Sequence, residues 1–172
     1  QVTLMTLYVV YLTSELTMSL TLAGVIYMVL QLSAVVGRLF WGAIGDRLVA
    51  SRKLLVLIGL GSAVFCALSG FYSIEWPIWA IVSVSFLLGI TTSGWNGLFF
   101  SELVKHAPEG KTGEAAGGLQ FATLSGVMIF PAVFGSLIGL FDSYLLAFSL
   151  LAGVIALAAL QFAASSDHGR SI

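Results

Sequence analysis

Five long apolar stretches, separated by short polar breaks, dominate this chain of 172 residues. Each is close to the ~20 residues that an α-helix needs to cross about 30 Å of hydrocarbon at 1.5 Å per residue. A backbone in lipid must satisfy its own hydrogen bonds, so each stretch is predicted to be a membrane-spanning helix. The predicted helices cover residues 21–44, 54–71, 78–101, 115–140 and 144–164.

The beginning of the chain follows a different pattern. The stretch QVTLMTLYVVYL offers only twelve apolar-leaning residues before Thr13, Ser14 and Glu15, and a helix of that length reaches about 18 Å. The first residue is Gln, and no positively charged segment precedes the apolar run. We therefore expect residues 1–18 to be a truncated helix, and the chain to be the C-terminal piece of a longer protein. Residues 165–172 are expected to form a tail.

Composition strengthens the membrane interpretation and excludes other classes. Hydrophobic residues make up 59% of the chain, charged residues 9%, and the mean hydropathy is +1.05. Soluble domains are about 45–50% apolar and about 25% charged. A net charge of −1 leaves no basic surface for a nucleic-acid partner. The H-E-x-x-H and G-x-S-G patterns of intramembrane proteases are absent from the sequence. An enzyme is disfavoured, and no metal or cofactor is predicted.

The distribution of charge predicts the topology. One set of polar breaks contains Glu15, Glu75 and Asp142 and no basic residue. The alternate set holds all seven basic residues, and cytoplasmic loops are enriched in Lys and Arg. This places the C-terminus in the cytoplasm, and six helices with both ends inside would be half of a twelve-helix arrangement. The seven residues are Arg38, Arg47, Arg52, Lys53, Lys105, Lys111 and Arg170.

The basic loop after the first complete helix carries a recognisable pattern, GRLFWGAIGDRLVASRK, at residues 37–53. It resembles the loop signature of the major facilitator superfamily, G-x-x-x-D-R-x-G-x-R-[RK], as it recurs between the eighth and ninth helices. Val49 stands where the signature has glycine, and Ser51 is a one-residue insertion. The residues that carry the resemblance are Gly37, Arg38, Gly42, Asp46, Arg47, Arg52 and Lys53.

Two later segments agree with the same family. Residues 94–118 resemble the end of a tenth helix and its cytoplasmic loop, with Glu102 near the helix end. Residues 126–148 resemble an eleventh helix kinked at Pro131, followed by a short turn into the twelfth. The predicted fold class is an all-α membrane protein: residues 1–164 form a six-helix transmembrane bundle, helices 7–12 of a twelve-helix transporter. The expected partners are the bilayer and an N-terminal six-helix half of the same chain.

The resemblance implies a secondary transporter that moves a small solute by alternating access in the bacterial inner membrane. It implies a cytoplasmic latch that contains Asp46 and Arg47, with Glu102 as a partner for Arg47 or Arg38. The alternative is that these charges only fix topology, because exposed ion pairs contribute about 0–1 kcal/mol. A self-contained six-helix channel, or a subunit that dimerises to form a carrier, is the competing function.

Polar and aromatic residues within the apolar stretches are the candidates for a substrate cavity. Tyr27, Gln31 and Arg38 lie within about 40° of one another on a helix. Trp95 and Phe99 share a helix face four residues apart. The other candidates are Asn96, Gln120, Thr123, Tyr8 and Tyr11. Each could instead serve as interhelical hydrogen-bond glue or as part of an interfacial aromatic belt.

The substrate is expected to be a small molecule, and an organic anion is one candidate class. The GWNG segment, residues 94–97, resembles permeases of which some carry organic anions. Arg38 would then be the charge partner in this half of the protein. No acidic residue lies in the middle of an apolar stretch.

Overall fold

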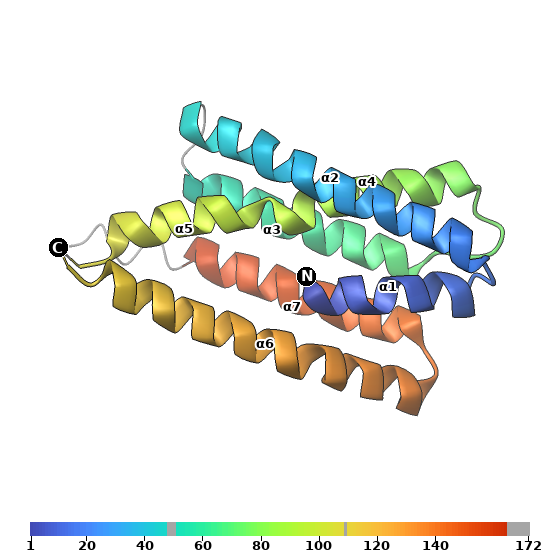
Figure 1. Ribbon diagram of the computed structural model, residues 1–172. Helices are drawn as coiled ribbons and strands as arrows, with labels where there is room; N and C mark the ends of the chain where they lie inside the picture. The colour runs from blue at the N-terminus through green and yellow to red at the C-terminus, as the bar shows by residue number, and fades with distance from the viewer. Residues whose placement is uncertain (48–50, 109, 165–172) are drawn as a thin grey trace.

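The computed structural model describes residues 1–47, 51–108 and 110–164, and these residues form a bundle of seven helices (Figure 1). No strand occurs among the residues it describes. The predicted fold class, an all-α membrane protein, is therefore confirmed. The helices are α1 (Val2–Ser14), α2 (Leu20–Arg47), α3 (Ser51–Gly70), α4 (Ile78–Ser93), α5 (Trp95–His106), α6 (Thr112–Phe141) and α7 (Tyr144–Ala164).

Five segments are long and apolar enough to cross a membrane. Helices α4 and α5 belong to one such segment, which is interrupted at Gly94. The single helix expected over residues 78–101 is thus two helices, and the second continues to His106. Helix α1 is apolar but shorter than the others. The five segments are Leu20–Gly45, Arg52–Gly70, Ile78–Val104, Thr112–Phe141 and Tyr144–Ala164.

The helices lie roughly side by side, and α4 continues into α5 within the bundle (Figure 1). The turns after α1, α3 and α6 lie at one end, and these contain the acidic residues Glu15, Glu75 and Asp142. The turn after α5 lies at the opposite end, with Lys111. Residues 48–50, which include Val49, and residues 165–172, the expected tail, lie outside the described residues.

Small residues allow the closest helix contacts. Helix α2 packs on α4, where a Cβ atom on Gly37 would collide with the backbone of Ile90. Helix α3 packs on α7, where a Cβ atom on Gly59 would lie 2.8 Å from that of Ala159. Lipid tails are as apolar as leucine, so helices in a bilayer associate through close packing rather than hydrophobic burial. These glycines therefore fix the α2–α4 and α3–α7 pairs.

Helix α6 is the least enclosed part of the bundle. Phe134 is the one buried residue of this helix, while Phe121, Met128 and Leu140 are each more than 75% exposed. The helix runs without interruption through Pro131, which has no N–H to bond the preceding turn. The kink expected at Pro131 stays a prediction. The bundle thus offers a long apolar face on α6 to lipid or to another part of the protein.

Candidate functional site

The interruption at Gly94 lies at the centre of the candidate site. Before it, the hydroxyl of Thr91 donates to the carbonyl of Leu87 at 2.9 Å, and the hydroxyl of Thr92 donates to the carbonyl of Leu88. Such hydrogen bonds back to the preceding turn compete with the backbone and often bend helices. The chain then restarts as α5, whose first residue is Trp95.

Two open cavities flank the side chain of Trp95. The inner cavity, of about 390 Å³, lies between α3, α5 and α7, and Phe99 and Phe162 line it. The α6 cavity, of about 290 Å³, lies between α1, α5, α6 and α7, and Asn96 and Thr123 line it. Both cavities share Gln1, Trp95, Val154 and Ile155. The indole of Trp95 therefore lies where the two cavities adjoin.

The lining is apolar and aromatic, with a few hydrogen-bonding groups. The rings of Trp95 and Phe99 meet edge to face with centroids 5.9 Å apart. Ser62 and Thr92 contribute hydroxyls to the inner cavity, and Thr3 contributes one to the α6 cavity. No charged side chain lines either cavity among the described residues. A concave apolar surface with few polar groups is typical of small-molecule sites.

Four of the predicted cavity residues are brought together here. Trp95, Asn96, Phe99 and Thr123 all line the cavities. Gln120 lies one turn from Thr123, but its side chain is exposed and lines neither cavity. Asn96 also donates from Nδ2 to the carbonyl of Ser93 at 3.5 Å, so its amide sits at the edge of the helix interruption.

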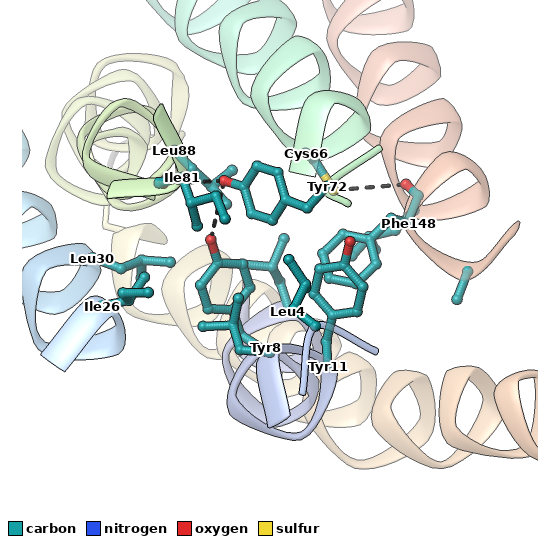
Figure 2. Close-up of a cluster of buried hydrophobic side chains, with 14 of the residues drawn as sticks. Leu4, Tyr8, Tyr11, Ile26, Leu30, Cys66, Tyr72, Ile81, Leu88 and Phe148 are labelled. Carbon is teal, nitrogen blue, oxygen red and sulfur yellow. Dashed lines mark hydrogen bonds between the residues drawn. The ribbon is translucent and has the colours of Figure 1, made fainter. Parts of the chain in front are cut away.

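Tyr8 and Tyr11 lie elsewhere, in a buried cluster between α1, α3 and α4 (Figure 2). The hydroxyl of Tyr8 lies 2.6 Å from Oγ of Ser85 and 3.3 Å from the hydroxyl of Tyr72. The hydroxyl of Tyr11 donates to the carbonyl of Ser69 at 2.8 Å. Both side chains are almost fully buried and line neither cavity. Their hydroxyls form hydrogen bonds within this chain, so the geometry gives the two tyrosines a packing role rather than the expected cavity role.

Tyr72 completes this cluster from the turn after α3. Its hydroxyl donates to the carbonyl of Ile81 at 3.4 Å, and its ring stacks on Tyr11 with centroids 6.2 Å apart. Burial raises the pKa of the Tyr72 phenol above its usual value, so the phenol stays protonated at neutral pH. The hydroxyls of Tyr8 and Tyr11 hold α1 against Ser85 on α4 and Ser69 on α3.

The polar face predicted on α2 is only partly enclosed. Tyr27 and Gln31 are half-buried, and Arg38 is exposed. Oε1 of Gln31 is buried and accepts no hydrogen bond within the described part of the chain. None of the three lines either cavity.

The residues of the loop motif have separate positions. Arg52 donates from a terminal guanidinium nitrogen to the carbonyl of Phe162 at 2.9 Å, and its guanidinium carbon lies 4.9 Å from the centre of that ring. A cation at the C-terminal end of α7 also complements the helix dipole. Lys53 is exposed, and Gly42 has no neighbour at the position of a Cβ atom.

The residues expected to form the latch stay untested. The side chains of Asp46 and Arg47, at the end of α2, lie outside the described part of the structure. Glu102 is half-buried on α5 and interacts with other residues.

Sequence reasoning missed the contact that organises the interruption. The indole nitrogen of Trp41 on α2 donates to the carbonyl of Ile90 at 3.0 Å, and a Cβ atom on Gly94 would overlap the indole. Trp41 stands inside the loop pattern, but its role depends on a segment about fifty residues later. The available signal was the pair of glycines, Gly89 and Gly94, within one apolar stretch.

Comparison with known proteins agrees with this architecture. Three similar proteins are each named multidrug resistance protein MdtG. The chain is 30% identical to that of Rahnella sp. (strain Y9602) over 123 residues, 71% of this chain and 28% of that protein. It is 31% identical to that of Proteus mirabilis (strain HI4320) over 119 residues, 69% and 28% of the two chains. It is 30% identical to that of Serratia proteamaculans (strain 568) over 136 residues, 77% and 31%.

The matched region spans less than a third of the length of each of these relatives. No solved structure matches the chain. The family model described as Major Facilitator Superfamily matches residues 1–168, nearly the whole chain. Together with the apolar helices, this confirms the predicted class, an integral membrane protein of a transporter family rather than an enzyme. The chain belongs to the Major Facilitator Superfamily.

Proposed function

We propose that this chain supplies one half of a secondary transporter that moves a small, largely apolar solute by alternating access. The other half would be a six-helix bundle of the same protein, and the membrane would be the bacterial inner membrane with the C-terminus in the cytoplasm. The observation that carries the proposal is the pair of adjoining cavities around Trp95. Transporters of this kind bind substrate between two repeats that rock against each other.

The chemistry of the cavities favours an uncharged or lipophilic substrate. Their volumes, about 390 and 290 Å³, are close to the lower range of drug-sized sites, about 300–1,000 Å³. An organic anion, the expectation from sequence, would meet no Lys or Arg among the described lining residues. Arg38 is exposed on α2 and lines neither cavity. The name of the three relatives, multidrug resistance protein, is consistent with a lipophilic substrate.

The loop motif would bias the two states of the carrier. Asp46 and Arg47 follow the α2 segment that packs on α4, and Glu102 lies on α5, which also contacts α2. An ion pair that forms in one state and breaks in the other would shift the balance between them, since a switch needs contacts that differ between its states. We propose that Asp46 and Arg47 make such a latch at the cytoplasmic end.

The test is transport by the full-length protein in proteoliposomes, with Nile red as an uncharged lipophilic probe and radiolabelled benzoate as an anion. Trp95→Ala should raise KM for the dye by about 10-fold or more, because burying a large apolar side chain contributes about 1.5–3 kcal/mol. Trp79→Ala is the matched control, since Trp79 is 73% exposed on α4 and lines neither cavity.

Saturable dye transport that Trp95→Ala weakens and Trp79→Ala leaves unchanged would support the proposal. Transport of benzoate and not of the dye would overturn the substrate class. Unsaturable flux that never exceeds equilibrium would indicate the channel alternative instead.

A further inference from the structure

One face of α2 contacts the α4–α5 segment on both sides of its interruption. Three residues of α2, each four apart, lie against three residues of the segment with the same spacing. Residues four apart share one face of a helix, so the contact is a continuous stripe. The facing pairs are Gly37 with Ile90, Trp41 with Gly94, and Gly45 with Leu98.

The central pair combines a hydrogen bond with a close steric fit. In an uninterrupted helix, the carbonyl of Ile90 would accept from the N–H of Gly94. The carbonyls of a helix's last turn need other partners, and here Nε1 of Trp41 donates to the carbonyl of Ile90 at 3.0 Å. A side chain at Gly94 would overlap the indole ring. Trp41 therefore both caps the end of α4 and occupies the space beside the interruption.

The outer pairs attach α2 to each of the two helices separately. Gly37 lies against the backbone of Ile90 at the end of α4, while a Cβ atom on Gly45 would overlap the side chain of Leu98 on α5. Helix α5 begins immediately after the interruption with Trp95 and Asn96, which line the two cavities. The direction in which α5 leaves α4 thus sets where these two side chains lie.

We propose that Trp41 is a positioning residue for the substrate cavities: its indole fixes the α4–α5 interruption and thereby the placement of Trp95 and Asn96. Trp41 lines neither cavity, so it acts through α5 and not by contact with substrate. The assignment rests on the proposed function only in that the cavities bind the transported solute. It also links the loop motif, in which Trp41 stands, to the cavity residues of another helix.

The first test measures geometry without transport. Asn96→Cys is introduced into the full-length protein in a background free of other cysteines, and its labelling rate with a maleimide is followed in membrane vesicles. Trp41→Phe keeps the ring and removes the N–H donor. Since a net hydrogen bond shifts an equilibrium by a factor of about five, the labelling rate should change about fivefold. Trp79→Phe, the same substitution at an exposed site, should leave the rate unchanged.

The second test measures transport of Nile red by the same variants without the added cysteine. Trp41→Phe should raise KM and leave kcat within about twofold, because loss of substrate positioning weakens binding in ground and transition states alike. Gly94→Ala should impair transport of the dye more than Trp41→Phe does. Adding Trp41→Ala to Gly94→Ala should restore part of that transport, because removal of the indole leaves room for the added methyl group.

The outcomes separate the two proposals. An unchanged labelling rate in Trp41→Phe, or strictly additive effects of Gly94→Ala and Trp41→Ala on that rate, would overturn the positioning role even if transport of the dye is confirmed. A fivefold change in labelling in a protein that transports no dye would support the positioning role and contradict the proposed substrate class. If Gly94→Ala does not accumulate in the membrane, Trp41→Phe alone decides.

Discussion

Removal of the Tyr8 hydroxyl should measurably loosen α1 from the bundle. In Tyr8→Phe, the short contact to Ser85 at 2.6 Å and the longer one to Tyr72 at 3.3 Å are both lost. Interhelical hydrogen bonds in membranes average about 0.6 kcal/mol and reach about 1.7. Ser85 keeps its bond to the carbonyl of Ile81 at 2.6 Å, so it is not left unsatisfied. We expect the free energy of unfolding to fall by about 1–2 kcal/mol, the contribution of two such interhelical hydrogen bonds.

A double-mutant cycle isolates the Tyr8–Ser85 contact. Tyr8→Phe, Ser85→Ala and the double variant of the full-length protein are unfolded reversibly in mixed micelles with increasing sodium dodecyl sulfate. The coupling energy should be about 0.6–1.7 kcal/mol, and residues in contact are those that depart from additivity. Ser83→Ala is the control, because Ser83 is exposed and its hydroxyl donates to the carbonyl of Trp79 within α4. Additive single effects would refute the claim that these hydroxyls join α1 to α4.

Three further predictions concern other parts of the bundle. Gly37→Ala should destabilise the protein by about 1–3 kcal/mol through overpacking against α4. Gly42→Ala, with open space at its Cβ position, should be neutral or stabilising. Thermal unfolding compares the two variants, and equal effects would contradict the described packing of α2 on α4. Arg52→Gln should lower the free energy of unfolding by about 1 kcal/mol, because it removes the hydrogen bond and ring contact at the end of α7. Lys53→Gln, at an exposed site, should leave the stability nearly unchanged in the same assay. Cys66 is buried, so a maleimide should label it only after detergent unfolding, and fast labelling of the folded protein would show that α3 is not packed as described.

The membrane helices could be predicted because length and hydropathy alone dictate them. The interruption at Gly94 could not, since the apolar stretch continues on both sides of this residue. The indole of Trp41 contacts this interruption from another helix. Gly89 and Gly94 mark where another helix can approach closely, but they do not identify the segment about fifty residues earlier that does so.

The residues of the candidate site could likewise be predicted only in part from the sequence. Trp95, Asn96 and Phe99 were predicted together because they cluster within one turn of one helix, and spacing along a helix is readable from sequence. Tyr8 and Tyr11 have the same residue type and the same kind of spacing, yet their hydroxyls bond to groups 77 and 58 residues away. The sequence shows that a phenol lies in a helix, but whether it meets a cavity or a serine depends on tertiary packing.

The α3–α7 pair has a consequence for how this chain is made. Gly59 lies against Ala159, and Gly70 lies against Phe148, so α3 finds its partner about 80–100 residues later in the chain. Ribosomes add about 5–20 residues per second, which leaves α3 in the bilayer without α7 for about 4–20 seconds. During that interval its small-residue face is covered by lipid or by a neighbour that α7 must displace. The packing of α3 is therefore complete only after α7, a much later segment of the chain, has been synthesised.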